Sequence, residues 1–287
     1  MTLIQYPTPS SSGDVSDLSS NGRTLEQVLR AASMPTRTVI LTILDKSWAS
    51  PPASVLDLFL ESFQIGERTK HLLNHLIIIA LDTHTLHYCQ SIRPHCFHFK
   101  STGQRRKELF LQVLQLGYNL VYTDVDVMWL RNPMSLFDGL AEISLGCDAY
   151  SRNQSVGSQK ATGEFFYIKA SEISMEFLKF WKVASVLYPY TQNQSICEMV
   201  MGEDIRLFGI RMKFIDKTYI GGLCQPNKDA SEIYVMQTNC CEELESKVHD
   251  LKIFLDDARK YKALLSNASS LEKFPSLATT PNRCLES

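Results

Sequence analysis

Two carboxylates that follow an apolar run are the residues of this chain whose types and spacing most clearly predict chemistry. Leu120–Thr123 has the apolar, aromatic and β-branched residues of a buried strand, and it leads directly into Asp124 and Asp126. Ligands of an open α/β sheet bind beyond the carboxyl ends of its strands, so this pair is predicted to lie at a binding edge. Two carboxylates suit a hard divalent cation such as Mn²⁺ or Mg²⁺, and such a cation can hold a diphosphate.

Other interpretations of this pair remain open. Carboxylates usually lie on solvated surfaces, but the apolar residues 127–130 that follow favour a metal site over a solvated turn. A Mg²⁺-dependent phosphatase with an Asp nucleophile would also begin with a strand and Asp-x-Asp. It would need a second acidic pair at another strand end, whereas Asp256-Asp257 falls within a predicted helix.

The remaining motifs carry weaker signals. Gly221-Gly222 could allow a close backbone approach to a ligand, although a simple turn is the favoured interpretation. The chain has neither the P-loop pattern nor Gly-x-Gly-x-x-Gly, which argues against P-loop and Rossmann dinucleotide chemistry. Six histidines occur early in the chain, and a surface or core role is favoured for them over a metal role; they are His71, His75, His84, His87, His95 and His98.

Size and charge limit the possible classes of protein. The 287 residues are 44% hydrophobic and 21% charged, which fits one large globular domain or two small ones. A net charge of −2 gives no indication of nucleic-acid binding. No apolar run is long enough to span a bilayer, and no signal peptide is visible. We expect a disordered tail over 1–22, a single domain over 23–270 and a flexible tail over 271–287.

The eight cysteines do not form a zinc pattern. Cys89 and Cys96 could close a small loop, and Cys224 could reach Cys240 or Cys241. Free buried thiols are the alternative. Three glycosylation sequons, at Asn153, Asn193 and Asn267, give weak support for a secretory lumen.

Apolar strands alternate with helical segments in the first half of the chain, which predicts an α/β fold with a parallel sheet covered on both faces. The second half is predicted to be mixed. The expected strands, besides the one at Asp124, are Thr38–Leu44, Leu76–Leu81, Ile143–Cys147, Phe165–Lys169 and Met212–Ile215. The expected helices are Thr24–Ala32, Val55–Ser62, Arg105–Leu116 closed by Gly117, Met134–Leu140, one that begins at Ser171, Gln194–Met201 and Glu242–Leu265. The helix capped by Ser171 is expected to bury Ile173, Phe177, Phe180 and Trp181. The apolar stripe of the last helix is Leu244, Val248, Leu251, Leu255 and Ala258.

Several segments together resemble a known family. They are Thr38-Val-Ile-Leu-Thr, Asp57-Leu-Phe-Leu-Glu-Ser-Phe63, Leu72-Leu-Asn-His-Leu76 and Gly117-Tyr-Asn-Leu-Val-Tyr-Thr-Asp-Val-Asp-Val-Met-Trp129 with Arg131-Asn-Pro133. The chain is similar, from about Leu25 to Leu265, to the plant nucleotide-diphospho-sugar transferases of glycosyltransferase family 77. This family includes cell-wall xylosyl- and arabinosyltransferases.

The resemblance implies a GT-A fold, a UDP-sugar donor, Mn²⁺, retention of anomeric configuration, a glycan or glycoprotein hydroxyl as acceptor, and a Golgi type II membrane setting. By position, Asp126 would ligate Mn²⁺, and Asp124 would contact the ribose or share the metal. Thr42 would lie near the base, and Thr162-Gly163 with the strand over 165–167 would line the sugar pocket.

Two departures from the family pattern bear on activity. The family carries His-Asp-Gln-Asp where this chain has Gln192-Asn193-Gln194-Ser195, and Gln194 is our candidate for a sugar-facing polar contact. The late His of the family, a third metal ligand, is Gln237 here. An amide holds Mn²⁺ more weakly than imidazole or carboxylate. A catalytically weakened or inactive relative that binds a nucleotide-sugar or a partner is therefore the second hypothesis.

Overall fold

A computed structural model describes residues 22–50, 54–100, 106–146, 165–187, 196–201, 209–224, 232–238, 241, 243–267 and 283–284. Its core is a seven-stranded sheet in the order β3-β2-β1-β4-β7-β6-β8, beside a three-stranded sheet in the order β5-β10-β9. The strands of the large sheet are β1 Thr38–Leu44, β2 Leu76–Ala80, β3 Cys96–His98, β4 Asn119–Thr123, β6 Ile143–Leu145, β7 Phe165–Ile168 and β8 Met212–Phe214; those of the small sheet are β5 Val127–Trp129, β9 Ile220–Gly222 and β10 Val235–Gln237.

The central strands are parallel and run almost without polar residues. β1 pairs with β2 and with β4 in parallel, and β2 pairs in parallel with β3. All seven residues of β1 and all five of β2 are buried. Strands that are buried on both faces need apolar side chains on both sides, which is why these segments are mostly apolar. The carboxyl ends of these four strands therefore share one edge of the sheet.

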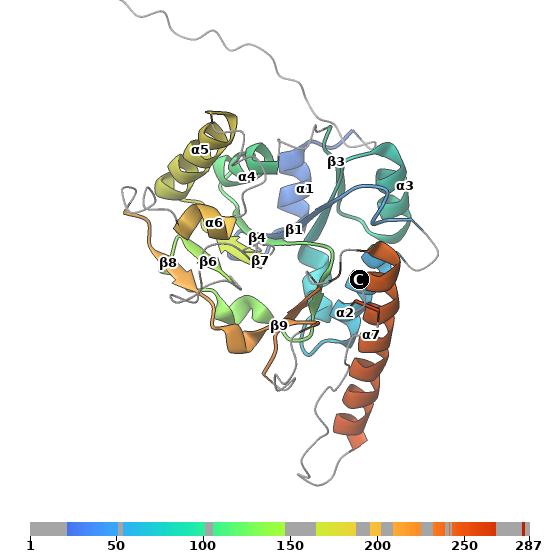
Figure 1. The fold of residues 1–287 in the computed structure, drawn as a ribbon. Helices are drawn as coiled ribbons and strands as arrows, with labels where there is room; N and C mark the ends of the chain where they lie inside the picture. The colour runs from blue at the N-terminus through green and yellow to red at the C-terminus, as the bar shows by residue number, and fades with distance from the viewer. Residues whose placement is uncertain are drawn as a thin grey trace, which may run out of the picture.

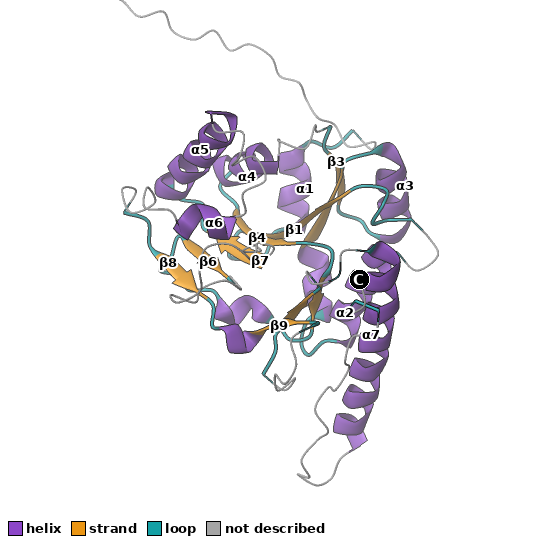
Figure 2. Cartoon of the chain, in the orientation of Figure 1, coloured by secondary structure: helices purple, strands orange, loops and turns teal. Residues whose placement is uncertain are grey.

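Helices cover the two faces of this sheet (Figures 1 and 2). The side chains of alternate strand residues divide between two apolar clusters, one on each face. On one face lie α1 Leu25–Ala32, α4 Arg106–Gln115, α5 Glu172–Leu187 and α6 Ile196–Met201; on the other lie α2 Val55–Ile65, α3 Thr83–Ile92, α7 Leu244–Asn267 and the small sheet. The α/β fold with a mostly parallel sheet and two helical layers is thus confirmed.

The second half of the chain is mixed, as the sequence predicts. β7 pairs antiparallel with both β4 and β6, and β10 pairs antiparallel with β5. Three short 3₁₀ helices complete the described elements, η1 Lys70–His75, η3 Pro133–Leu136 and η6 Lys217–Tyr219. The predicted helix over 134–140 is therefore only a single 3₁₀ turn, begun by the side chain of Asn132 accepting a hydrogen bond from the amide of Met134.

Local signals at helix ends are confirmed, but some apolar positions are not fully buried. Gly117 closes α4 with φ of +79°, a conformation that favours glycine. The side chain of Ser171 accepts a hydrogen bond from the amide of Ser174 at the start of α5. Ile173 and Leu244, predicted to be buried, are 41% and 39% exposed, and Phe180 and Val248 are half-buried, because the buried faces of the two helices run through other positions, such as Phe177 in α5 and Leu251 in α7. No described helix has the length and apolar composition of a membrane span.

The sequence left open whether the cysteines form disulfides or remain free thiols, and the described cysteines form disulfides. Cys89 pairs with Cys96, as expected, and Cys241 pairs with Cys284, which rules out Cys241 as a partner of Cys224. Cys197 and Cys224 are also disulfide-bonded. No described cysteine is free. Cys284 is buried, so the segment over 271–287 departs from the expected flexible tail at this point, whereas the expected tail over 1–22 lies almost wholly outside the described residues.

Candidate functional site

The structure places Asp124 and Asp126 at the carboxyl end of β4, in the turn that joins the large sheet to β5. Asp126 is only 6% exposed, and Asp124 keeps 21% of its side-chain surface. The amide of Val127 donates to the carbonyl of Asp124 at 3.2 Å, which holds the turn in shape. Both carboxylates therefore lie at the edge of the sheet at which the sequence predicted them.

Asp126 is held by two side chains from the far end of the chain. The ammonium of Lys247, in the first turn of α7, donates to Asp126 Oδ2 in a buried ion pair. The hydroxyl of Thr238 donates at 3.2 Å to both the backbone oxygen and Oδ2 of Asp126. The lysine ammonium also lies 5.1 Å from the centre of the Trp48 ring, in a cation–π contact. Burying two opposite charges is costly unless hydrogen bonds complete the pair, and here they do.

Asp124 is held by residues on the opposite face of the sheet from α7, the face that α4 covers. The hydroxyl of Tyr122 donates to Asp124 Oδ1, and the guanidinium of Arg106 lies 3.9 Å from the same oxygen. Burial raises the pKa of Asp124, Arg106 opposes that rise, and the nearby charge of Asp126 adds to it. The two carboxylates therefore feel each other's charge, and each has its own cation, Arg106 for Asp124 and Lys247 for Asp126.

The third expected ligand, Gln237, lies beside this pair. It ends β10, it is 1% exposed, and it is paired with Val127 of β5, so its strand position adjoins Asp126. On its other side it pairs with Gly222 of β9. Gly221-Gly222 is therefore part of a strand, and the predicted turn is wrong. The reason is packing: a Cβ at Gly221 would crowd the side chain of Met236, so glycine lets β9 lie close to β10.

Thr42 lies inside β1, two residues before its carboxyl end, and is fully buried. Its hydroxyl has no hydrogen-bond partner among the described residues. A buried hydroxyl without a partner is unusual, and it faces the same apolar layer as α7, since its strand neighbours Ile40 and Leu44 do. Contact of Thr42 with a base stays a prediction.

The remaining predicted positions are divided between the core and the undescribed segments. Thr162, Gly163 and Gln194 lie outside the described residues. The strand over 165–167 is β7, which is buried between β4 and β6 and packs its rings on Trp129 and Phe137. This strand therefore packs against both strands that flank the acidic turn, β4 and β5. Lining of a sugar pocket by its residues remains a prediction.

Sequence reasoning missed Lys247, Thr238, Arg106 and Trp48 as members of this site. For Lys247 a signal existed. The buried face of α7 runs through Leu251, Phe254 and Ala258, and Lys247 is its extension by one helical turn. A lysine on the apolar face of a helix, in the first turn, where the helix dipole disfavours a cation, indicates a specific anionic partner.

The polar side chains at this edge offer oxygen atoms that could bind a divalent cation. The carboxylates of Asp124 and Asp126 and the amide oxygen of Gln237 are hard oxygen ligands of the type that Mn²⁺ and Mg²⁺ take. The described residues hold no cluster of three His, Cys, Asp or Glu side chains that could bind a metal. The ligand chemistry thus fits a cation, but Lys247 holds an oxygen of Asp126 that the cation would need.

The phosphatase alternative and the histidines can be examined on the same structure. Asp256 and Asp257 lie in α7 and form ion pairs within the helix with Arg259 and Lys260, so they are not at a strand end. Asp256 and Asp257 therefore do not provide the second acidic pair that the phosphatase interpretation needs. The Nδ1 of His75 lies 2.8 Å from the carbonyl oxygen of Ala32, and His84 and His87 are exposed on α3.

The chain is similar to several known proteins. The family model described as nucleotide-diphospho-sugar transferase matches residues 71–251. An uncharacterized protein of Arabidopsis thaliana is 30% identical over 257 residues, covering 83% of this chain and 68% of that protein. A UDP-D-xylose:L-fucose alpha-1,3-D-xylosyltransferase of the same plant is 39% identical over 67 residues, which are 23% of this chain and 17% of the enzyme. Among solved structures, the galactosyltransferase LgtC, in complex with donor and acceptor sugar analogs, is 10% identical and covers 82% of this chain and 98% of its own, with a TM-score of 0.45.

The family match spans the acidic turn, Gln237 and Lys247, the residues that the fold brings together. The architecture described above, a mostly parallel sheet between two helical layers, confirms the predicted α/β class. The chain belongs to the nucleotide-diphospho-sugar transferase family and is a glycosyltransferase.

Proposed function

We propose that this chain transfers a sugar from a UDP-sugar to the hydroxyl of a glycan or glycoprotein, with the donor diphosphate bound between the acidic turn of β4 and the first turn of α7. The observation that supports this most is the buried ion pair of Asp126 and Lys247 at that edge. The N-terminus of a helix attracts phosphate through its backbone N–H groups and dipole, and Lys247 adds a full positive charge at the same point.

In this proposal Lys247 exchanges partners when the donor binds. In the free protein its ammonium neutralises Asp126. A diphosphate carries more negative charge than one carboxylate, so the ammonium turns to the phosphate oxygens and leaves Asp126 with Thr238 as its hydrogen-bond donor. Arg106 remains on Asp124. Positive charge beside the diphosphate stabilises the charge that develops as the glycosidic bond breaks.

A divalent cation fits the same account. Asp126, Asp124 and the amide oxygen of Gln237 are the residues that would hold Mn²⁺ or Mg²⁺ here. Once bound, the ion would neutralise charge on the leaving diphosphate. Gln237 replaces the imidazole of the family at this position, which lowers the expected affinity for Mn²⁺ and makes the contribution of Lys247 larger.

The other roles follow from the family. Thr42 contacts the base, Thr162 and Gly163 line the sugar pocket, and Gln194 contacts the sugar. The reaction retains the anomeric configuration, and the leaving phosphate takes the acceptor proton, so no separate base is assigned. UDP-xylose and UDP-arabinose are the first donors to test, because named relatives are a xylosyltransferase and an arabinofuranosyltransferase.

The setting we propose is the Golgi lumen, in the assembly of plant cell-wall glycans or glycoproteins. Disulfides persist in the secretory pathway and are rare in the cytosol. This chain has two described disulfides and two further bonded cysteines, and the three sequons point the same way.

A donor panel tests the proposal directly. Purified protein is incubated with UDP-xylose, UDP-arabinose, UDP-galactose and UDP-glucose, with Mn²⁺ or with EDTA, and release of UDP is measured beside binding of each donor. We expect one donor to bind and to be hydrolysed slowly in the absence of acceptor. Binding without turnover would support the second hypothesis, a non-catalytic relative, which the amide at Gln237 motivates.

A further inference from the structure

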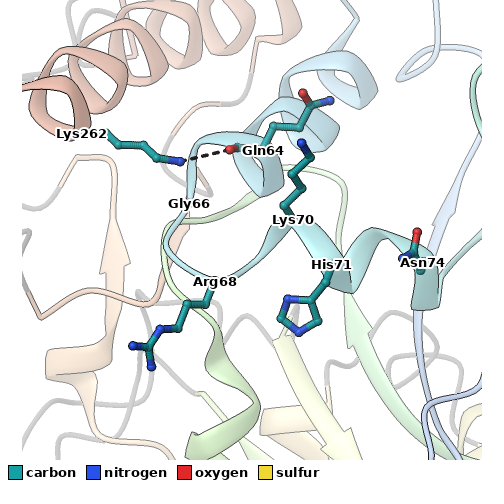
Figure 3. A pocket seen from close by; sticks show the side chains of 7 residues that line it. All are labelled: Gln64, Gly66, Arg68, Lys70, His71, Asn74 and Lys262. Atoms are coloured by element: carbon teal, nitrogen blue, oxygen red, sulfur yellow. Dashed lines mark hydrogen bonds between the residues drawn. The ribbon is translucent and has the colours of Figure 1, made fainter. Parts of the chain in front are cut away.

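A second polar site lies at the far end of α7. A cavity of about 570 Å³ opens between the end of α2, the loop over 66–69, the helix η1 and the C-terminal half of α7. Figure 3 shows the side chains that line it, with Lys262 reaching across from α7. Its lining residues are Gln64, Gly66, Arg68, Lys70, His71, Asn74 and Lys262. Four of these seven are basic and none is acidic, so we call this the basic pocket.

The basic pocket is distinct from the site at Asp126. Lys70–His75 leads into the amino end of β2, whereas the acidic turn follows the carboxyl end of β4, which is parallel to β2 in the sheet. Lys247 and Lys262 mark the two sites on the same helix, and their separation along its axis is roughly 22 Å. One ligand of the size of a nucleotide-sugar would not cover both.

The positive charges of the basic pocket are not balanced by carboxylates. Arg68, Lys70 and His71 are exposed and take part in none of the ion pairs found among the described residues. Lys262 donates to the carbonyl oxygens of Ile65 at 2.6 Å and Gln64 at 3.3 Å, so it has hydrogen-bond partners but no counter-charge. The field of such a group attracts anions.

The loop that presents Arg68 is held rigidly. The amide of Glu67 donates to the carbonyl of Leu130 at 2.8 Å, and the amide of Asn132 donates to the carbonyl of Glu67 at 3.0 Å. The hydroxyl of Thr69, fully buried, donates to the carbonyl of Phe63 at 2.7 Å. A Cβ at Gly66 would collide with the carbonyl oxygen of Trp129, so glycine is required for this close approach. The loop is therefore formed before any ligand arrives.

Arg68 itself has a strained backbone. Its φ is +56°, in the left-handed region that L-residues other than Asn, Asp and Gly rarely adopt. Strain of this kind costs of order 1 kcal/mol and clusters at sites that bind ligands. Here it presents a guanidinium, the side chain best suited to two-point contact with a carboxylate or phosphate, among the residues that line the pocket.

We propose that the basic pocket binds an anionic group, a carboxylate or a phosphate, with Arg68 and Lys70 as its main contacts and His71 and Lys262 supporting them. The two sources of such a group are a uronate-containing glycan and a free phosphate. The test uses inorganic phosphate, a tetramer of galacturonic acid and, as a neutral control, a tetramer of xylose, each titrated into the full-length protein by calorimetry at two salt concentrations.

The variant is Arg68→Asn/Lys70→Gln, in which Asn tolerates the positive φ. The matched control is Arg30→Gln/Lys252→Gln, which removes two positive charges from exposed positions on α1 and α7. We expect at least one anionic probe to bind, more weakly at high salt, and the xylose tetramer not to bind. The pocket variant should lose at least about tenfold in affinity and the control variant less than about twofold.

A third protein, Lys247→Met, separates this proposal from the proposed function. Anion binding that survives in Lys247→Met but not in the pocket variant supports the basic pocket, whatever the result of the donor panel. Binding of phosphate alone identifies a phosphate site, and binding of the uronate tetramer identifies a glycan carboxylate. Failure of both anions to bind, or equal binding by the pocket variant and its control, would overturn the proposal. The single change Lys70→Gln, at an exposed position, gives the same comparison should the double variant not fold.

Discussion

The two ends of α7 carry two lysines in opposite circumstances. Lys247 is 7% exposed, and its ammonium meets a carboxylate that is itself buried. Lys262 is exposed, and its ammonium meets only backbone carbonyl oxygens at the end of α2. A buried pair must be complete to be tolerated, because removal of one partner leaves an unpaired charge in the core. An exposed cation is tolerated alone, and it is available to solutes.

This difference explains why the two ends of α7 are suited to different tasks. At the Asp126 end, an incoming diphosphate has to compete with a carboxylate for one ammonium, so binding is selective for a strongly charged ligand. At the basic pocket no described carboxylate is paired with Arg68, Lys70 or Lys262, so weaker anions are expected to bind. The following four predictions test this contrast, starting with the largest expected effect.

Replacement of the buried carboxylate should have the largest effect. In Asp126→Asn the ammonium of Lys247 is left buried without a counter-charge, so we expect a loss of about 3 kcal/mol in the free energy of unfolding. Transfer should fall by at least about 10²-fold, since the turn no longer binds the donor correctly. Urea denaturation and UDP release measure the two effects. In Asp126→Asn/Lys247→Met most of the stability should return but transfer should not. A double variant as active as the wild type would contradict the assignment.

Replacement of the buried lysine should change two properties in opposite directions. In Lys247→Met we expect kcat/KM for the donor to fall by about 10²-fold, because a charge-assisted contact with the diphosphate is lost. Affinity for Mn²⁺ without donor should rise, since no ammonium competes for Asp126. Electron paramagnetic resonance of free Mn²⁺ measures the second effect. Lys252→Met, on the same helix and exposed, is the control and should change neither property. Unchanged Mn²⁺ affinity together with normal transfer would contradict the exchange of partners.

The disulfide of Cys241 and Cys284 anchors the buried half of α7. Asp250 accepts hydrogen bonds from the amides of Arg283 at 3.0 Å and Cys284 at 2.9 Å, so the bridge holds this segment against the helix. Replacing both cysteines by serine should lower the free energy of unfolding by about 2–4 kcal/mol.

The control for this prediction is the shorter bridge. Cys89 and Cys96 are separated by 7 residues, whereas Cys241 and Cys284 are separated by 43. The loss from Cys89→Ser/Cys96→Ser should be smaller by about 1.5 kcal/mol, because a short loop loses less entropy on closure. Chemical denaturation compares the two variants, and a larger loss from the short bridge would show that the C-terminal segment does not anchor α7.

The smallest effect is expected at the exposed end of the helix. Lys262→Met removes a cation from the last carbonyls of α2, where such contacts contribute at most about 1 kcal/mol. Transfer should stay within about twofold of the wild type, because the basic pocket is remote from Asp126. Thermal unfolding and UDP release provide the comparison. A tenfold loss of transfer in a folded Lys262→Met protein would show that the two ends of α7 are coupled.

The sequence predicted the parts of the fold that depend on local pattern. β1, β2 and β4 are rich in apolar and β-branched residues, so their burial and their parallel pairing could be inferred. The strands β5, β9 and β10 have three residues each, too few for a periodicity. They exist because they pair with one another, and the partners Val127 of β5 and Gln237 of β10 are 110 residues apart in the chain. Long-range pairing of this kind leaves no local signal.

In the candidate site, too, only residues with a local signal or a counterpart in the family could be predicted from the sequence. Asp124 and Asp126 were found because they follow a strand, and Gln237 because it replaces a family residue. Lys247 was missed because the apolar stripe of α7 was drawn through Leu244, which is exposed, and not through Phe254, which is buried. The correct face of the helix depends on what packs against it, and only the structure shows Asp126 there.

The central claim is that the acidic turn and Lys247 together bind a nucleotide diphosphate. Calorimetric titration of UDP in the presence of Mn²⁺ into the wild type, Asp126→Asn/Lys247→Met and Arg68→Asn/Lys70→Gln tests it most directly. Our account predicts that the wild type and the basic-pocket variant bind UDP with affinities within about twofold of each other, and that the Asp126/Lys247 variant binds at least about tenfold more weakly. Equal affinity in all three proteins, or loss of binding in the basic-pocket variant alone, would contradict it.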